Sequence, residues 1–219
     1  MAVIQYQGRP AQRESSEQRR RAILDAALAI IVRDGIRNVR HRAVAKEAEV
    51  PLSATTYYFK DIGDLIVDCF TLFAEQAMET VVRPIGQTVQ QLIEAELANE
   101  NLSEQRYPEI VEKICQLMAD YIQDLVQTSR NHLIAEQAFL QEATLDQRLQ
   151  PLAVAYIHHH LEVVAPLCEA LQVPDAEQAA NIIWNALMQL EFRLLIDNSM
   201  TRDDIVSYFR VLLQGLMSR

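Results

Sequence analysis

Apolar residues recur along most of this chain at helical spacing, and polar stretches divide the pattern into separate segments. The first segment begins near Ser15 or Ser16, either of which can cap a helix, and ends at Gly35, a residue typical of helix C-termini. The positions i, i+3, i+4 and i+7 that form its buried face are Ile23, Ala26, Ala27 and Ile30. We therefore predict an amphipathic helix over this segment.

Two shorter helical patterns follow and meet at a tight break. The first starts after Arg40 and stops at the sequence Glu49-Val50-Pro51. Because proline lacks a backbone N–H and is tolerated in a first helical turn, Pro51 opens a second helix, roughly Leu52 to Tyr58. Isolated helices under about 12 residues are marginal in water, so neighbouring elements must hold this one.

The remainder of the chain predicts longer helices. An apolar-rich helix runs from Asp64 to about Val82, and Arg83-Pro84 marks its end or a kink. Further helices are expected at roughly 86–99, 107–129, 131–142, 151–171, 176–197 and 202–217. The sequence has no strand-like alternation, so the predicted fold class is all-α.

Composition agrees with a helical protein and bears on its location. Half of the 219 residues are hydrophobic, and only 5 are glycine and 7 proline, which favours long helices over a turn-rich β fold. No run approaches the roughly 18 apolar residues of a membrane span. Met1 to Pro10 has no signal-peptide pattern. We expect a cytoplasmic protein with no membrane partner.

Charge is distributed unevenly along the chain. Residues 1–60 hold 11 Lys and Arg against 6 Asp and Glu, a net of +5, and residues 61–219 hold 9 against 24, a net of −15. This asymmetry is expected when one small module binds the phosphates of a nucleic-acid duplex and the rest of the protein does not contact that duplex. Arg9 and Arg13 lie in a predicted flexible arm, residues 1–14, and either reach the DNA or belong to a disordered terminus. Arg19 to Arg21 hold positive charge in a first helical turn, which suggests phosphate contact.

The short helix after Pro51 carries the most distinctive chemistry. Its hydroxyl side chains are Ser53, Thr55, Thr56, Tyr57 and Tyr58. One interpretation is a solvated polar face. The other is a helix-turn-helix whose second helix enters the major groove, where hydroxyls bind phosphate oxygens or base edges. The flanking charges Arg42 and Lys60 and the apolar anchors Phe59 and Leu65 favour the second interpretation.

Five motifs between residues 19 and 70 occur in an order that resembles the DNA-binding domain of the tetracycline-repressor (TetR) family of bacterial regulators. The motifs are R-x-x-I-L-D-A-A-L from Arg20 to Leu28, Asp34-Gly35, A-x-x-A-x-V from Ala45 to Val50, Y-Y-F-K from Tyr57 to Lys60, and D-L-I from Asp64 to Ile66. They cover about a quarter of the chain. The rest resembles the family only in its helical content and length.

The resemblance implies a three-helix helix-turn-helix head over residues 15–62 and a helical effector-binding and dimerisation body over residues 63–219. It implies a homodimeric transcriptional repressor that binds a palindromic operator in double-stranded DNA and is released by a small-molecule effector. The residues expected to contact DNA are Arg42, Ser53, Thr55, Thr56, Tyr57, Tyr58 and Lys60. No cofactor is implied.

Three positions depart from the family pattern. Glu49 stands where glycine is usual in the turn, Arg40 where threonine or serine usually starts the second helix, and Ile62 where a lysine usually grips phosphate. A non-glycine residue at positive φ costs roughly 1–2 kcal/mol, and a missing side-chain N-cap about 1 kcal/mol. An alternative therefore stays open, a helical sensor or interaction protein that retains the fold without sequence-specific DNA binding.

The body of about 150 residues is larger than dimerisation requires, and in the family it encloses a cavity for a small-molecule effector. Apolar and amphipathic side chains of its predicted helices are the candidates for such a pocket, although each also suits a core. They are Phe73, Met118, Tyr121, Phe139, Tyr156 and His159. The sequence does not identify the effector.

The last two predicted helices suit a subunit interface. Residues 181–196 are apolar around much of the helix circumference, which is typical of a helix that is central or shared between subunits. The expected interface residues are Ile183, Trp184, Leu187, Leu190, Phe209, Leu212, Leu213 and Leu216. A dimer places two recognition helices about 34–36 Å apart, which matches successive major-groove faces of DNA.

The sequence motifs predict neither an enzyme nor a metal site. His158, His159 and His160 point about 100° apart on a helix, so they cannot converge on one ion. The sequence contains no glycine-rich phosphate loop, G-x-S-x-G elbow or H-E-x-x-H motif. Its cysteines have no C-x-x-C spacing and are expected to be buried reduced thiols: Cys69, Cys115 and Cys168.

Overall fold

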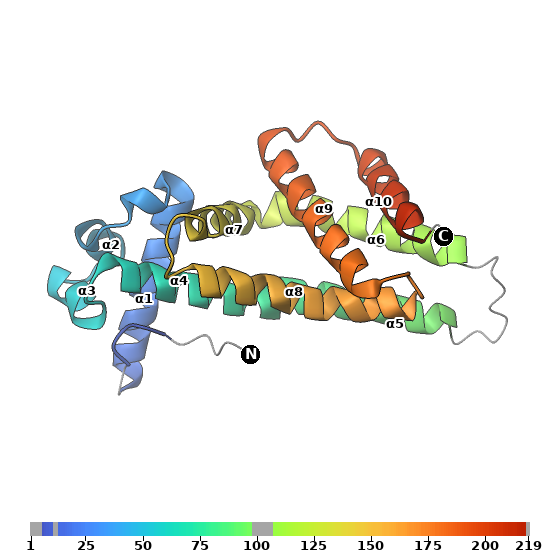
Figure 1. The fold of residues 1–219 in the computed structure, drawn as a ribbon. Coiled ribbons are helices and arrows are strands. Elements are labelled where there is room, and N and C mark those ends of the chain that lie inside the picture. Colours follow the sequence, from blue (N-terminus) through green and yellow to red (C-terminus); the bar gives the residue numbers. More distant parts are fainter. Residues whose placement is uncertain (1–5, 11–12, 98–106, 218–219) are drawn as a thin grey trace. The chain divides into compact units, whose positions relative to one another are not determined.

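The computed structural model describes residues 6–10, 13–97 and 107–217, and every regular element in these ranges is helical (Figure 1). The elements are α1 (Glu14–Asp34), a 3-10 turn (Ile36–Asn38), α2 (His41–Glu47), α3 (Leu52–Tyr58), α4 (Ile62–Ala77), a π-helical turn (Met78–Val82), α5 (Arg83–Leu97), α6 (Tyr107–Thr128), α7 (Arg130–Ala143), α8 (Gln150–Ala170), α9 (Ala176–Ile196) and α10 (Arg202–Met217). The all-α prediction is confirmed. Within these ranges no helix has the length and apolar character needed to cross a membrane.

The limits of most helices lie within a few residues of those predicted, and α3 has the predicted limits, Leu52–Tyr58. The start of α1 differs from the prediction, because the N-cap is Arg13 and its side chain makes no capping hydrogen bond. Glu14 and Glu17 lie in the first turn, where carboxylates interact favourably with the helix dipole, so the helix starts before either serine. The helix predicted over 86–99 begins earlier, at Arg83, and its predicted end lies outside the described residues.

The chain does not leave the helical path at Arg83-Pro84. A π-helical turn, Met78–Val82, precedes this pair, and α5 continues directly from it. A proline near the start of α5 lacks the N–H that an uninterrupted α-helix would need there, and the wider i→i+5 pairing of a π turn accommodates that loss. The predicted kink is therefore a local change in helical pitch.

Contacts divide the chain into two units, each with its own core. Unit 1 consists of Met1–Ala77 and Ile134–Ile157, and unit 2 of Met78–Leu133 and His158–Arg219. The π turn begins where unit 1 gives way to unit 2. Because unit 1 combines α1 to α4 with parts of α7 and α8, its core joins residues from two distant stretches of sequence.

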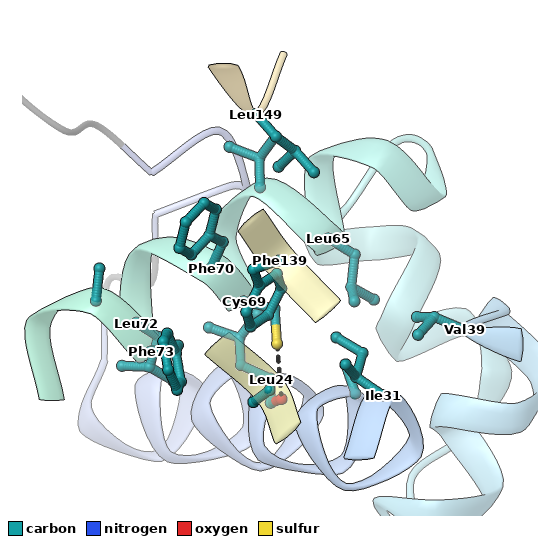
Figure 2. Packing of buried hydrophobic residues seen from close by; sticks show 14 of the residues in the cluster. Leu24, Ile31, Val39, Leu65, Cys69, Phe70, Leu72, Phe73, Phe139 and Leu149 are labelled. Carbon is teal, nitrogen blue, oxygen red and sulfur yellow. Dashed lines mark hydrogen bonds between the residues drawn. The ribbon is translucent and has the colours of Figure 1, made fainter. Parts of the chain in front are cut away.

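The core of unit 1 is organised around α4 (Figure 2). Leu24 and Ile31 of α1 belong to the same buried cluster as α4. The Cys69 thiol donates a hydrogen bond to the Leu24 carbonyl oxygen at 3.6 Å. On α4, Phe70 stacks on Phe139 of α7 with ring centroids 4.7 Å apart and an angle of 4° between the planes. An aromatic stack therefore ties the second stretch of unit 1 to the first.

Unit 2 is held by a second apolar cluster and by ion pairs between its helices. α10 and α5 both pack on α6. The Arg210 guanidinium donates two hydrogen bonds of 2.8 Å to the Glu112 carboxylate, which holds the pKa of that carboxyl down at about 2. The cysteines of this unit, Cys115 and Cys168, are buried and free, as Cys69 is in unit 1, so the expectation of buried thiols is confirmed.

The turn between α2 and α3 forms although it lacks the glycine usual in the family. Glu49 has a φ of 53°, in the left-handed region. The Val50 N–H donates to the Ala45 carbonyl oxygen at 3.0 Å, and the Glu49 N–H to the Lys46 carbonyl oxygen at 3.3 Å. This hydrogen-bond pair defines a Schellman motif. Glu49 therefore adopts a positive φ, and the unusual residue leaves the turn type intact.

Candidate nucleic-acid interface

Helix α3 divides its hydroxyl side chains between two faces. Ser53, Thr56 and Tyr57 are exposed, with 55% of the Tyr57 surface accessible, and Lys60 follows beyond the helix end. The spacing i, i+3 and i+4 of Ser53, Thr56 and Tyr57 places these three on one side of the helix. The Thr56 hydroxyl lies 3.3 Å from the Ser53 carbonyl oxygen on this side. Three of the predicted DNA contacts therefore share one outward surface, which we call the α3 outer face.

Two predicted contacts lie on the opposite, inner face of α3. Thr55 is fully buried, and its hydroxyl donates to the Leu52 carbonyl oxygen at 2.8 Å. Tyr58 is 5% exposed, and its ring meets the Tyr57 ring edge to face at 5.1 Å. Both side chains are buried in the core beneath α3, so the exposed hydroxyls of Ser53, Thr56 and Tyr57 are the stronger candidates for DNA contact.

Two exposed cations of the helix-turn-helix region have no carboxylate partner in the described part of the chain. Arg42 on α2 and Lys60 after α3 are exposed, and in the described ranges no acidic side chain lies within ion-pair distance of either. Arg33 on α1 differs, because its guanidinium is paired with Glu47 and Asp34. Exposed cations left unneutralised beside exposed hydroxyls suit a polyanionic backbone.

The start of α4 is capped by an acid. The Asp61 carboxylate accepts the Asp64 N–H at 2.9 Å, and this bond lowers the pKa of Asp61. Arg148, from the turn before α8, lies 3.3 Å from the same carboxylate. Ile62 is half-buried and has no cationic group. Position 62 therefore offers no charge for the phosphate contact that a lysine usually makes there in the family. Lys60 is the nearest cation in the sequence.

Arg20 does not serve the surface that its position in the first helix suggested. Its side chain is 7% exposed, and its guanidinium pairs with the buried Asp68 at 2.8 Å. Arg21 lies 3.4 Å from Asp25. The sequence could not reveal this internal pairing, because Asp68 lies 48 positions further along the chain.

Comparison with known proteins identifies the body of the chain. The family described as tetracyclin repressor-like, C-terminal domain, matches residues 109–219, just over half of the sequence. This chain belongs to that family. A search of curated proteins gives no match.

Solved structures share the fold of this tetracyclin repressor-like chain. The multidrug binding protein EbrR complexed with proflavin is 24% identical with a TM-score of 0.55, over 90% of this chain and 99% of EbrR. A TetR-family member from Streptomyces coelicolor A3 is 23% identical with a TM-score of 0.58, over 92% and 99% of the two chains. A transcriptional regulator from Rhodococcus sp. Rha1 is 12% identical with a TM-score of 0.60, over 90% and 95%. At these identities the likeness extends to the fold, a helix-turn-helix head with a helical body.

The residues predicted for an effector pocket fall in different units of this TetR-family chain. Phe73, Phe139 and Tyr156 belong to unit 1, where they are at most 2% exposed. Their ring centroids lie 5.4 Å apart for Phe73 and Phe139, and 6.1 Å apart for Phe73 and Tyr156. These three rings form a packed core closed to solvent. Met118, Tyr121 and His159 belong to unit 2 and are partly exposed.

A buried carboxyl group adjoins the aromatic rings of unit 1. The Tyr156 hydroxyl donates to the Glu136 carboxylate at 2.5 Å, and Glu136 is 4% exposed. Burial raises the pKa of Glu136 to about 7, although the tyrosine hydrogen bond opposes that rise. Sequence reasoning missed this group, since the apolar residues around Glu136 give no sign that the acid faces inward.

Polar side chains are also buried in unit 2. His160 is 8% exposed, and its ring meets Trp184 at 6.1 Å. Burial and the neighbouring His160 lower the pKa of His132 to about 4. Trp184 is 9% exposed, and its indole N–H finds no acceptor in the described part of the chain. Such unsatisfied buried donors are uncommon in folded proteins.

The residues predicted for the dimer interface are partly internal to the protomer. Three are buried in the apolar core of unit 2: Leu190, Phe209 and Leu213. Trp184 is also buried, with its ring against His160. Four are half-buried: Ile183, Leu187, Leu212 and Leu216. The apolar residues that α9 and α10 do expose were not predicted, namely Ile182, Phe192, Ile196 and Val211. Because the sequence of α9 is apolar around most of the helix, it could not show which side packs against its own protomer.

The raised pKa of Glu136 predicts a pH-dependent stability. An unfolded glutamate ionises near 4.5, whereas folded Glu136 holds its proton up to about pH 7. Its contribution to the free energy of unfolding is therefore full below about pH 4.5 and is lost as pH rises through 7. Glu136→Gln, which is uncharged at every pH, should melt close to the wild-type temperature at pH 5 and clearly above it at pH 8.

Thermal unfolding of both proteins at the two pH values measures this difference. Glu162→Gln is the matched control, because Glu162 is an exposed acid of α8. Melting temperatures that differ by the same amount at pH 5 and pH 8 would show that Glu136 is ionised throughout.

Proposed function

We propose that this chain is a homodimeric repressor that binds a palindromic operator through α3 and is released by a small-molecule effector. The observation that carries the proposal is the α3 outer face, where Ser53, Thr56 and Tyr57 are exposed while the opposite face of the helix is buried. Arg42 on α2 and Lys60 after α3 are exposed cations of the same region without a carboxylate partner among the described residues. Membership of the tetracyclin repressor-like family supports the regulatory role.

The contacts divide into two chemical kinds. Ser53, Thr56 and Tyr57 offer hydroxyl groups and, for threonine, a methyl group, which suit base edges in the major groove. Arg42 and Lys60 offer charge, which suits phosphates and carries no sequence information by itself. The alternative of a sensor that does not bind DNA drew its support from Glu49 and Ile62. The intact Schellman turn at Glu49 removes the first of these reasons.

Tyr57→Ala should weaken operator binding by about 1–3 kcal/mol. The loss should be smaller on a random-sequence duplex, because the side chain is assigned to base readout. Fluorescence anisotropy with labelled duplexes that tile the DNA upstream of the chain's own gene measures both affinities. Since Tyr57 is more than half exposed, the melting temperature should stay at the wild-type value. Equal losses on both duplexes would remove Tyr57 from base readout.

Lys60→Ala is the contrasting variant in the same assay. It should weaken binding to all sequences alike, and it should reduce the slope of log affinity against log salt by about 2 for a dimer, roughly 0.9 for each phosphate contact. A slope equal to that of the wild type would count against a phosphate contact at Lys60.

Dimerisation is assigned to the exposed faces of α9 and α10. Ile182, Phe192 and Ile196 repeat along α9, and Val211 is 71% exposed on α10. Val211 also lines a groove together with Met200, Tyr208 and Leu212 and polar neighbours. Antiparallel helix pairs from two protomers can bury such faces as a four-helix bundle. The half-buried residues predicted from sequence, such as Leu212, then lie at the edge of the interface.

Val211→Glu should convert the dimer to a monomer. Two carboxylates brought into an apolar interface cost several kcal/mol, so the dissociation constant of the dimer should rise by at least about 100-fold. Sedimentation velocity at micromolar concentration measures it. Leu145→Glu is the matched control, since Leu145 is 63% exposed in unit 1. A Val211→Glu protein that remains dimeric would move the interface to another surface.

The effector site is assigned to unit 2. Met118, Tyr121 and His159 keep accessible surface there, whereas the predicted residues of unit 1 are closed. The buried Trp184 indole N–H needs an acceptor that the described protein does not offer, and an effector with a carbonyl or ether oxygen would supply one. EbrR, which shares the fold, is a multidrug binding protein complexed with proflavin, which supports an aromatic effector here.

Trp184→Phe should weaken binding of an aromatic effector about 5- to 15-fold, because a buried donor–acceptor bond contributes about 1–1.5 kcal/mol. The wild-type chain contains one tryptophan, so quenching of its fluorescence screens aromatic carbonyl compounds without a label. Isothermal calorimetry then compares the best compound on wild type and variant. Equal affinities would separate Trp184 from the effector site.

A further inference from the structure

The carboxylate of Asp68 on α4 anchors a segment of chain from before α1. Asp68 is fully buried, and it accepts the Gln7 N–H at 2.5 Å, the Gly8 N–H at 3.0 Å and the Arg20 guanidinium at 2.8 Å. Hydrogen bonds to an ionised acceptor are roughly twice as strong as neutral ones. Two successive backbone amides are therefore fixed at one point on α4.

A second point of attachment lies one helical turn or more further along α4. The Tyr6 hydroxyl donates to the Glu75 carboxylate at 2.6 Å. The Tyr6 ring lies under the Arg20 guanidinium, whose central carbon is 4.4 Å from the ring centroid. Partial burial and the Glu75 hydrogen bond raise the pKa of Tyr6. The stretch Tyr6–Pro10, which we call the strap, is therefore tied down by side chains as well as by its backbone.

Gly8 permits the close approach of the strap to the core. A Cβ atom at this position would lie 2.6 Å from Cε1 of the buried Phe59 ring and 2.7 Å from an Asp68 carboxylate oxygen. Neither neighbour has room to withdraw, because both are fully buried. A methyl group at residue 8 would therefore displace the strap from Phe59 and Asp68 without changing any charge.

The strap ends at the C-terminal end of α3. The Arg9 N–H donates to the Tyr58 carbonyl oxygen at 2.8 Å, which satisfies one of the acceptors that a helix end leaves unpaired. The Arg9 guanidinium lies over the Tyr57 ring, 4.4 Å from its centroid. Arg9 is exposed, and in the described ranges no carboxylate lies within ion-pair distance of it.

We propose that the strap makes Arg9 a DNA-backbone contact of the α3 outer face. The guanidinium carbon lies over the Tyr57 ring, and in the described ranges no carboxylate pairs with the guanidinium, so its N–H groups are available for a phosphate. Asp68 and Gly8 are positioning residues, because they act through the strap backbone. The inference rests on the proposed operator binding and adds a contact that lies outside the helix-turn-helix.

The decisive experiment compares wild type, Arg9→Ala and Arg83→Ala for binding to an upstream operator duplex and a random-sequence duplex over a range of salt. Arg83 is an exposed arginine of unit 2, so its variant loses the same charge elsewhere. Arg9→Ala should bind both duplexes about tenfold more weakly, with a salt slope lower by about 2 for the two protomers. Arg83→Ala should match the wild type.

Gly8→Ala tests whether the strap positions the Arg9 guanidinium beside Tyr57. It should lose affinity and salt slope as Arg9→Ala does, and Gly8→Ala added to Arg9→Ala should cost nothing further, because both changes remove one contact. Melting curves identify a temperature at which all variants are folded. Since Arg9 is exposed, its own variant decides the matter even where Gly8→Ala is unstable.

Three results would overturn the inference. An Arg9→Ala protein with weaker binding and an unchanged salt slope would show that Arg9 only orients Tyr57, and unchanged binding would leave Arg9 no part at all. A Gly8→Ala protein that binds like the wild type would show that Arg9 acts from an unanchored arm. If the wild-type protein binds neither duplex, the proposed function itself fails. If Lys60→Ala weakens binding and Arg9→Ala does not, operator binding stands and only the Arg9 contact is wrong.

Discussion

Helix α4 is buried along nearly its whole length, and the position of every other element of unit 1 depends on that burial. Its buried residues include large apolar groups such as Leu65, Phe70 and Phe73, and also the polar Asp68 and Thr71. A helix covered on most sides must have partners on most sides. α1, the parts of α7 and α8 in unit 1, and the strap are those partners. The short α3 can present a polar outer face because its inner face is fixed on this core.

An ion pair inside such a core needs a physical account. Removing Asp68 and Arg20 from water carries a desolvation cost that can exceed their mutual attraction, so the pair is weak evidence for stability. Removing one partner alone is far more costly, at about 3–5 kcal/mol. The pair has a directional consequence, however. Asp68 is fully satisfied only when the backbone of Gln7 and Gly8 lies against it, so the carboxylate selects one path for the chain that precedes α1.

The sequence predicted the local features of this protein well and its long-range pairings poorly. The limits of α3 and the uncapped start of α2 follow from residue types within a few positions. The inward side of α3 did not follow, because Thr55 and Thr56 are chemically equal and differ only in which faces the core. The pattern of hydroxyls could identify a surface helix without dividing its two faces.

The same limit explains the missed and misplaced residues elsewhere. Arg20 and Asp68 are 48 positions apart, and Tyr156 and Glu136 meet across two helices. On α9, Trp184 and Ile182 are both apolar, yet the first is buried and the second is 47% exposed. The spacing of two residues on a helix gives the angle between their side chains. It does not show which of the two side chains faces the core. Only the packing partners fix that direction.

The composite core of unit 1 has a consequence for the order in which this protein is made. Phe70 stacks on Phe139, and Tyr156 also contacts both Phe70 and Phe73. When α4 leaves the ribosome, these partners have not been synthesised, and at about 5–20 residues per second they follow on the order of ten seconds later. During that interval the apolar side of α4 is exposed to chaperones and to other nascent chains. A fragment that ends at Ala77 would lack the Phe139 and Tyr156 rings that cover Phe70 and Phe73.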